Sequence, residues 1–274
     1  MILRNEDQQT EHHPSGLRLP GTPEQSADQL LSAWDAVASV QRRDQLPCWF
    51  VTQPDHAHIS GVIAANFDRT RFPWLTDELI QAIGLHDEGW EAFDGSSPEP
   101  RPVISAEDGR AIPFLALPPE VYLRAWRSSI GRAERLGALA GLLVSRHFQE
   151  LGKFGFERLK SQPADADLVR QFLEEESQRE RRLGGDHDPK ELQLLLSILQ
   201  FCDLLSLHLC SNAPQPVEFA QGFGCGKVTL RRQGASVTLS PTPLAGPVAL
   251  RFSVYLAERN RTVRRSRSVE LQLS

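Results

Sequence analysis

The stretch DPKELQLLLSILQFCDLLSLHLC, residues 188–210, decides the fold. Pro189 suits the first turn of a helix, and Asp188 with Glu191 forms an Asp-x-x-Glu variant of the capping box, so the start of the helix is defined. The helix is apolar on nearly every side, which predicts that it runs through the centre of the protein.

Asp203 lies on one stripe of this helix with Leu196, Leu199 and Ser206, so its carboxylate is expected to be buried. A buried carboxylate without a partner costs several kcal/mol or becomes neutral. Asp203 therefore needs a metal ion, an arginine or a histidine beside it.

Two further predicted helices carry candidate partners. A helix starting near Pro54 places His56 on the same face as Ser60, whereas His58 faces elsewhere. A second helix starts after the N-cap residue Thr76 and is expected to run through His86 and Asp87 to Trp90. Its apolar stripe ends at an adjacent imidazole and carboxylate, and a cation between them would satisfy both.

A fourth helix, expected from about residue 120 to residue 151, aims His147 inward in line with Trp126 and Val144. A single inward histidine is more often a hydrogen-bonded core group than a ligand. Four helices that deliver these groups to one core would bury several unpaired polar atoms, and a divalent ion removes that penalty. The sequence therefore predicts a metal site formed by His56, His86, Asp87 and Asp203; a hydrogen-bonded polar core without metal is the alternative.

At these residues the sequence resembles the HD superfamily, which has a histidine, a later His-Asp pair and a distant aspartate. Four segments, Gln53–Ala57, His86–Trp90, Ser145–Phe148 and Asp203–Leu207, resemble the bacterial family known as domain of unknown function 3891, and the likeness covers roughly residues 47 to 273. The resemblance implies a right-angled helical bundle around a metal centre and hydrolysis of phosphate esters. Dinuclear members of the superfamily have two further histidines, and this chain offers only His147, so one ion is favoured over two.

Mixed nitrogen and oxygen ligands suit Mn, Fe, Ni or Zn, and such an ion lowers the pKa of its bound water to about 7. The expected activity is a metal-dependent hydrolase, most simply a phosphohydrolase that acts on a small phosphate ester or a nucleotide. The candidate catalytic residues are Asp87, His147 and Glu88, and the candidate substrate-binding residues are Arg146, Lys153, Trp90 and Gln53. His147 is either an extra ligand or the acid that protonates the leaving group.

Three other functions stay open. A sensor would bind a nucleotide-like ligand without turnover, a non-haem iron oxygenase of the same fold would need two irons, and a structural or interaction protein would bind no metal. The net charge of -5 and the pI of about 5.9 offer no broad basic surface, so nucleic acid is an unlikely partner. No run reaches the roughly 18 apolar residues of a membrane span. The expected location is the cytoplasm, and a homodimer is left open.

The predicted fold is mainly α, an HD-like helical bundle followed by a small C-terminal antiparallel β-sheet. Residues 1–22 are expected to be a flexible tail, and a short helix follows at about 26–41. Residues 23–212 form the metal-binding helical domain, with a proline-rich loop at 94–119, and residues 213–274 form a β subdomain packed on it. The expected strands are 217–219, 227–231, 236–239, 248–256 and 268–273, with a solvated arginine-rich turn at 259–267.

Overall fold

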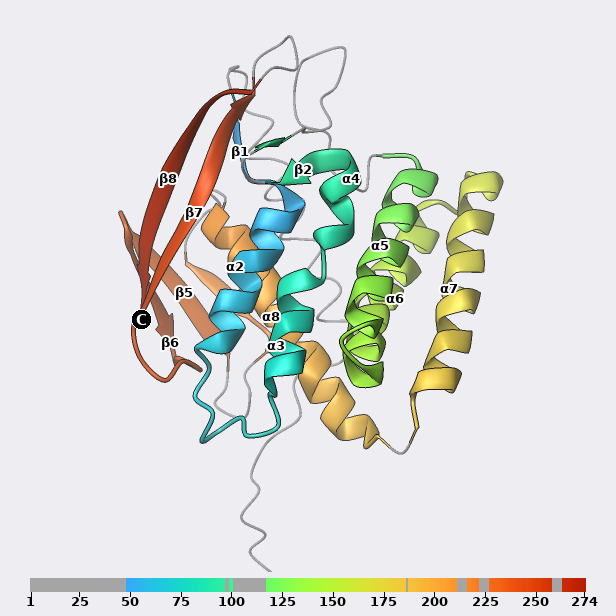
Figure 1. Cartoon of the computed structure of the whole chain (residues 1–274), viewed down its shortest axis with the longest axis horizontal. Helices are drawn as coiled ribbons and strands as arrows, with labels where there is room; N and C mark the ends of the chain where they lie inside the picture. The colour runs from blue at the N-terminus through green and yellow to red at the C-terminus, as the bar shows by residue number, and fades with distance from the viewer. Residues whose placement is uncertain are drawn as a thin grey trace, which may run out of the picture.

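A computed structural model describes residues 48–96, 99–100, 117–185, 187–210, 216–221, 227–257 and 263–274 (Figure 1). The predicted N-terminal tail, the helix expected at 26–41, most of the proline-rich loop and the side chains of the arginine-rich turn lie outside these residues. A six-stranded sheet lies along one side of the molecule and the long helix α7 lies on the opposite side.

The helical part comes between the first strand and the remaining strands of the sheet. In chain order its elements are α2 (Gln53–Ala65), α3 (Asp77–Leu85), the 3-10 helix η1 (Glu88–Trp90), α4 (Glu91–Asp94), α5 (Pro119–Glu134), α6 (Ala138–Arg158), α7 (Pro163–Leu183) and α8 (Pro189–Cys210). Helices α2 and α8 lie between the sheet and the other helices in Figure 1.

Local capping explains where the site-bearing helices begin. Thr52 accepts a hydrogen bond from the backbone N–H of Asp55 at the start of α2, and Thr76 accepts one from the backbone N–H of Leu79 at the start of α3. These contacts satisfy amide groups that have no partner within the first turn of a helix. Both starts agree with the sequence prediction.

The single helix predicted from residue 120 to residue 151 is wrong, because the segment forms two helices. Helix α5 ends at Glu134, and Gly137 adopts an extended backbone before α6 begins at Ala138. An apolar residue at every third or fourth position continues through both helices, so the sequence period alone did not reveal the break. His147 still faces inward, because α6 buries Val144, His147 and Leu151 on its own inner face.

Helix α8 is the central helix, as the sequence predicted. Sixteen of its residues, from Leu192 to Leu209, are buried. Within the described residues it is the one helix long and apolar enough to cross a membrane, and 89% of its most apolar window is buried inside the structure. Its apolar surface is therefore already used in packing.

The sheet contains six strands in the order β1-β7-β8-β6-β5-β4. Their bounds are β1 (Cys48–Phe50), β4 (Val217–Phe219), β5 (Val228–Gln233), β6 (Ser236–Ser240), β7 (Val248–Ala257) and β8 (Val263–Leu273); a separate two-stranded ladder pairs β2 (Gly95–Ser96) with β3 (Glu99–Pro100).

The predicted small antiparallel sheet, and with it the mainly α fold class, is wrong. Strands β6 and β8 pair in parallel at Ser236↔Gln272 and Val237↔Leu273, so the sheet is mixed. Strand β1 joins the sheet through β7 although it precedes every described helix of the chain. The protein is therefore a mixed α/β structure. Alternation of apolar residues indicates that a strand exists, but it does not indicate which strand lies beside it.

Helices and sheet share one hydrophobic core. Phe201 of α8 packs against Phe219 of β4, with ring centroids 5.0 Å apart, and against Phe67 after α2, with centroids 6.1 Å apart. The sheet thus supports α2 and α8, the two helices that carry His56 and Asp203.

Candidate metal centre

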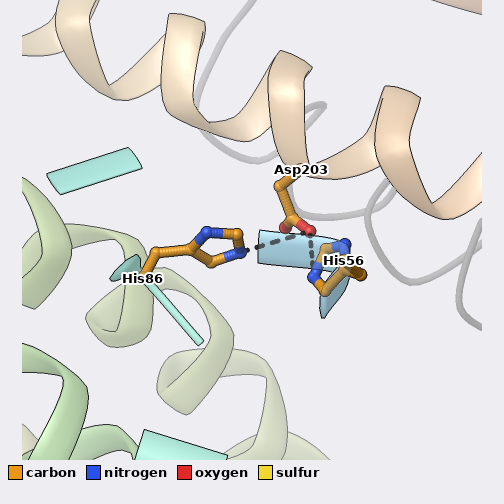
Figure 2. Close-up of side chains that lie close together, drawn as sticks. All are labelled: His56, His86 and Asp203. Atoms are coloured by element: carbon orange, nitrogen blue, oxygen red, sulfur yellow. Dashed lines mark ion pairs between the residues drawn. The ribbon is translucent and has the colours of Figure 1, made fainter. Parts of the chain in front are cut away.

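Two buried histidines from distant parts of the chain meet a buried aspartate of α8. His56 comes from the first turns of α2, His86 follows the last residue of α3, and Asp203 comes from α8 (Figure 2). Helices α2 and α3 approach closely at Gly61, where an added Cβ would lie 2.7 Å from the Cα of Gly84. This close approach requires glycine, and it brings the imidazole rings of His56 and His86 to a centroid distance of 5.2 Å.

Asp87 adds a fourth group to this cluster. Nε2 of His56 lies 3.3 Å from Oδ2 of Asp87 and 3.4 Å from Oδ1 of Asp203. Nε2 of His86 lies 3.6 Å from the same two oxygens. Atoms that share one ion at bond lengths of about 2.1 Å lie about 3.4 Å apart in a tetrahedral arrangement, whereas N–H···O hydrogen bonds are about 2.9 Å long. The spacings of His56, His86 and Asp203 fit a shared ion, since one ligand atom of each lies within 4.8 Å of the other two. Asp87 contacts both imidazoles from beside this group, and its 3.3 Å contact with His56 is within hydrogen-bond distance.

The orientation of His86 also fits a metal ligand. Its Nδ1 lies 2.7 Å from the backbone carbonyl oxygen of Ile83, and a carbonyl only accepts, so Nδ1 carries a hydrogen. The neutral ring therefore turns the bare lone pair of Nε2 toward Asp87 and Asp203. Both Nε2 of His86 and Oδ1 of Asp203 are buried and have no hydrogen-bond partner among the described residues. Metal-binding histidines usually have this arrangement, with the second ring nitrogen donating to a fixed acceptor.

The charges in the centre are compatible with a bound cation. With neutral histidines, the buried carboxylates of Asp87 and Asp203 leave two uncompensated negative charges. Burial alone would lower the pKa of His86, but the nearby carboxylates of Asp87 and Asp203 raise it to about 9. Burial raises the pKa of Asp203, yet the nearby ring of His86 holds it below its usual value. A proton on His86 offsets one charge, and a divalent ion offsets both.

His147 lies on the far side of Asp203. Its Nε2 is 3.6 Å from the other carboxylate oxygen, Oδ2, and its ring is nearly perpendicular to that of His86 at a centroid distance of 5.4 Å. Burial lowers the pKa of His147 to about 4, against the opposing charge of Asp203, so the ring is neutral at physiological pH. Its Nδ1 is buried and has no hydrogen-bond partner.

The helix predicted to run from Thr76 to Trp90 ends earlier, and that difference shapes the centre. Helix α3 stops at Leu85, His86 caps it, and Asp87 leaves the helical conformation with φ -113° and ψ 14°. The backbone N–H of Gly89 then donates to Oγ of Ser129 on α5 at 2.9 Å. The turn lets His86 face Asp203 while Asp87 lies against the rings of His56 and His86. A continuous helix would point the two members of the pair about 100° apart.

The structure places the other candidate residues in less central positions. Glu88 pairs with Arg132 at 2.8 Å. Arg146 pairs with Glu180, and the exposed Lys153 pairs with Glu150. In addition, Trp90 is buried in the core against Phe93, and Gln53 donates its backbone N–H to Asp94. Arg146 and Lys153 therefore already have carboxylate partners.

Sequence reasoning missed one titratable group near the centre. Asp94 accepts the backbone N–H of Gln53 through Oδ2 at 2.8 Å, at the start of the helix that carries His56. Burial raises the pKa of Asp94 to about 7, with the Gln53 hydrogen bond opposing and the charges of Asp55 and Asp87 adding to the rise. No sequence signal marked it, because Asp94 opens the proline-rich segment and belongs to no apolar stripe.

The comparisons with known proteins identify a family but no activity. The sequence model of a family described as "Protein of unknown function (DUF3891)" matches residues 40–257. No curated protein and no solved structure matches the chain. The matched range contains all four residues of the centre.

Proposed function

The chain belongs to the DUF3891 family of proteins of unknown function, and from this premise we propose that it is a metal-dependent hydrolase. One divalent ion of Mn, Fe, Ni or Zn would be held by His56, His86, Asp87 and Asp203. The observation that carries the proposal is the buried cluster of His56, His86 and Asp203, whose ligand atoms all lie within 4.8 Å of one another. Oδ2 of Asp87 lies 3.3 and 3.6 Å from the two imidazole nitrogens of this cluster.

The donor set favours an ion over a hydrogen-bonded polar core. The Ile83 carbonyl holds a hydrogen on Nδ1 of His86, so without a metal only the protonated ring has a hydrogen on Nε2 to donate toward the carboxylates, and it offsets only one of the two charges. A buried carboxylate pair without a compensating charge costs several kcal/mol. Two imidazoles and two carboxylates form a ligand set that first-row transition metals accept.

A metal held here would lower the pKa of a bound water to about 7 and polarise an oxygen of the substrate. His147 and Asp94 are titratable groups beside the ligands, and such a reaction would use their protons. His147 lies against Oδ2 of Asp203, and Asp94 is coupled electrostatically to Asp87.

The finer proposal is that the substrate is a small phosphate ester or a nucleotide. Its support is the resemblance of the histidine, His-Asp pair and distant aspartate to the HD superfamily of phosphohydrolases. Since Arg146 and Lys153 have other partners, phosphate charge would be met chiefly by the metal. Non-catalytic ligand binding is the competing proposal.

Metal analysis tests the proposal. The purified protein is expected to hold about one transition-metal ion per chain, whereas His86→Ala and Asp203→Ala should lose it. His58→Ala is the matched control, because His58 is an exposed histidine two residues from His56 on α2. Full metal content in both site variants would refute the site.

A panel of phosphomonoesters and phosphodiesters, assayed with each of the four metals, then tests the substrate class. Turnover that disappears in Asp203→Ala supports hydrolysis by this centre. Tight binding of a nucleotide without turnover would instead favour the sensor.

A further inference from the structure

We infer that Ser206 is a positioning residue that holds His56 in the tautomer required of a metal ligand. The inference rests on the proposed function, because it needs the centre to bind a metal. It explains the serine of the Asp203–Leu207 segment, which the proposed reaction does not use.

Ser206 is fully buried and its single hydroxyl hydrogen is already committed. Its Oγ donates to the backbone carbonyl oxygen of Asp203, one turn earlier on α8, at 2.8 Å. Buried serines in helices often make such a bond to a preceding carbonyl. A hydroxyl has one hydrogen and two acceptor positions, so any other partner of Ser206 has to donate to it.

Nδ1 of His56 is one such partner, at a short distance from Oγ of Ser206. Since Ser206 accepts, Nδ1 of His56 carries the hydrogen and Nε2 carries the bare lone pair. With a metal bound, that lone pair would point to the ion between Nε2 and the carboxylate oxygens Oδ2 of Asp87 and Oδ1 of Asp203, which lie 3.3 and 3.4 Å from Nε2. Without a metal, the 3.3 Å contact with Asp87 is within hydrogen-bond distance. The contact joins residues 150 positions apart, so it depends on the packing of α2 against α8.

Ser60 of α2 also contacts the hydroxyl of Ser206. Its Oγ lies 3.0 Å from Oγ of Ser206, and it also lies within hydrogen-bond distance of the backbone carbonyls of His56 and Cys202. Both serines are buried, so water does not compete for the hydroxyl of Ser206. The two histidines are thus oriented differently: His86 by a backbone carbonyl that mutation cannot remove, and His56 by a side chain that it can.

Two measurements test the inference: the zinc affinity of serine variants, and which ring nitrogen of His56 carries the hydrogen. Ser206→Ala is expected to weaken zinc binding by about 10- to 100-fold, the usual effect of losing a partner of a ligating histidine. Ser197→Ala should keep wild-type affinity. Ser197 is also a buried serine of α8, and its hydroxyl bonds only a preceding backbone carbonyl, that of Gln193, at 2.9 Å.

¹⁵N NMR of the zinc-bound wild-type protein decides the point even if Ser206→Ala folds poorly. A hydrogen on Nδ1 of His56, protected from exchange with water, is expected, and its protection should fall in Ser206→Ala. Wild-type zinc affinity in a folded Ser206→Ala protein would overturn the inference, as would a hydrogen on Nε2 of His56 in the wild type. A wild-type protein that binds no zinc would instead refute the metal centre itself.

Discussion

Replacing Gly89 by alanine tests whether α5 fixes the position of the His86–Asp87 pair. An added Cβ at Gly89 would lie 2.0 Å from the carbonyl oxygen of Ala125 and 2.7 and 2.8 Å from N and Oγ of Ser129. These atoms belong to α5, and two of the three are backbone atoms that cannot rotate away. The segment around Gly89, directly after the His86–Asp87 pair, therefore has to move away from α5.

The size of the movement follows from these distances. Relieving the contact from 2.0 Å to 3.4 Å, where ordinary contact begins, requires a shift of about 1.4 Å. Metal sites tolerate ligand displacements of about 0.2 Å, so Asp87, two residues away, is expected to leave the ligand set. Overpacking of this kind costs about 1–3 kcal/mol, which corresponds to a fall in Tm of roughly 2–12 °C for a chain of this size.

The assay combines thermal unfolding with a zinc titration of the folded protein. Gly89→Ala is expected to lower zinc affinity by roughly tenfold or more, in addition to lowering Tm. Gly131→Ala is the matched control. Gly131 is a glycine of α5, the helix that Gly89 contacts, and its added Cβ would meet nothing within 4 Å. Alanine there should raise helix stability by about 0.5–1 kcal/mol and leave zinc affinity unchanged.

The reasoning would be refuted by a Gly89→Ala protein that keeps wild-type zinc affinity. A variant with lower Tm but unchanged affinity would show that the contact serves stability alone. Equal losses of zinc affinity in Gly89→Ala and Gly131→Ala would also contradict it, because the second substitution meets no neighbouring atom.

Because the pKa of His86 is raised to about 9, its protonated form should stabilise the metal-free protein fully below pH 6.5, and this stability should be lost as pH rises through 9. Zinc has to displace that proton, so competition titrations should show affinity rising roughly tenfold per pH unit up to about pH 9. Glu176→Ala should cost about 2–3 kcal/mol in urea unfolding without changing zinc stoichiometry, because this buried carboxylate accepts from Arg179 at 2.8 Å. Glu88→Gln should leave zinc affinity unchanged in the same titration, because the carboxylate is paired with Arg132.

Local sequence signals located most elements of the fold. Thr76 caps α3 as predicted, Pro54 lies in the first turn of α2 as predicted, and the glycine pair at 184–185 follows the end of α7. Four strands of the C-terminal region lie within two residues of the predicted positions, whereas β8 begins at Val263, five residues earlier than predicted, so the turn expected at 259–267 is wrong for residues 263–267. Capping and apolar periodicity depend on neighbours within about four residues, so they can be read without knowing the rest of the structure.

The sequence prediction was wrong where contacts between distant segments, and not the local spacing of apolar residues, decide the structure. The apolar spacing through Gly137 continues as if one helix ran to residue 151, yet the chain turns there between α5 and α6. The parallel pairing of β6 with β8 and the addition of β1 beside β7 depend on how separate segments dock. Alternation within a strand carries no information about those partners.

The sequence by itself determined that Asp203 is buried on the central helix and that inward-facing histidines accompany it, because helical phase fixes which side chains face the core. Only the tertiary structure decided which atoms meet. The close approach at Gly61 and Gly84, the end of α3 at Leu85 and the contact between Ser206 and His56 set the distances and the tautomer. These features arise from packing between segments far apart in the chain, and ligand geometry is sensitive to displacements smaller than a side chain.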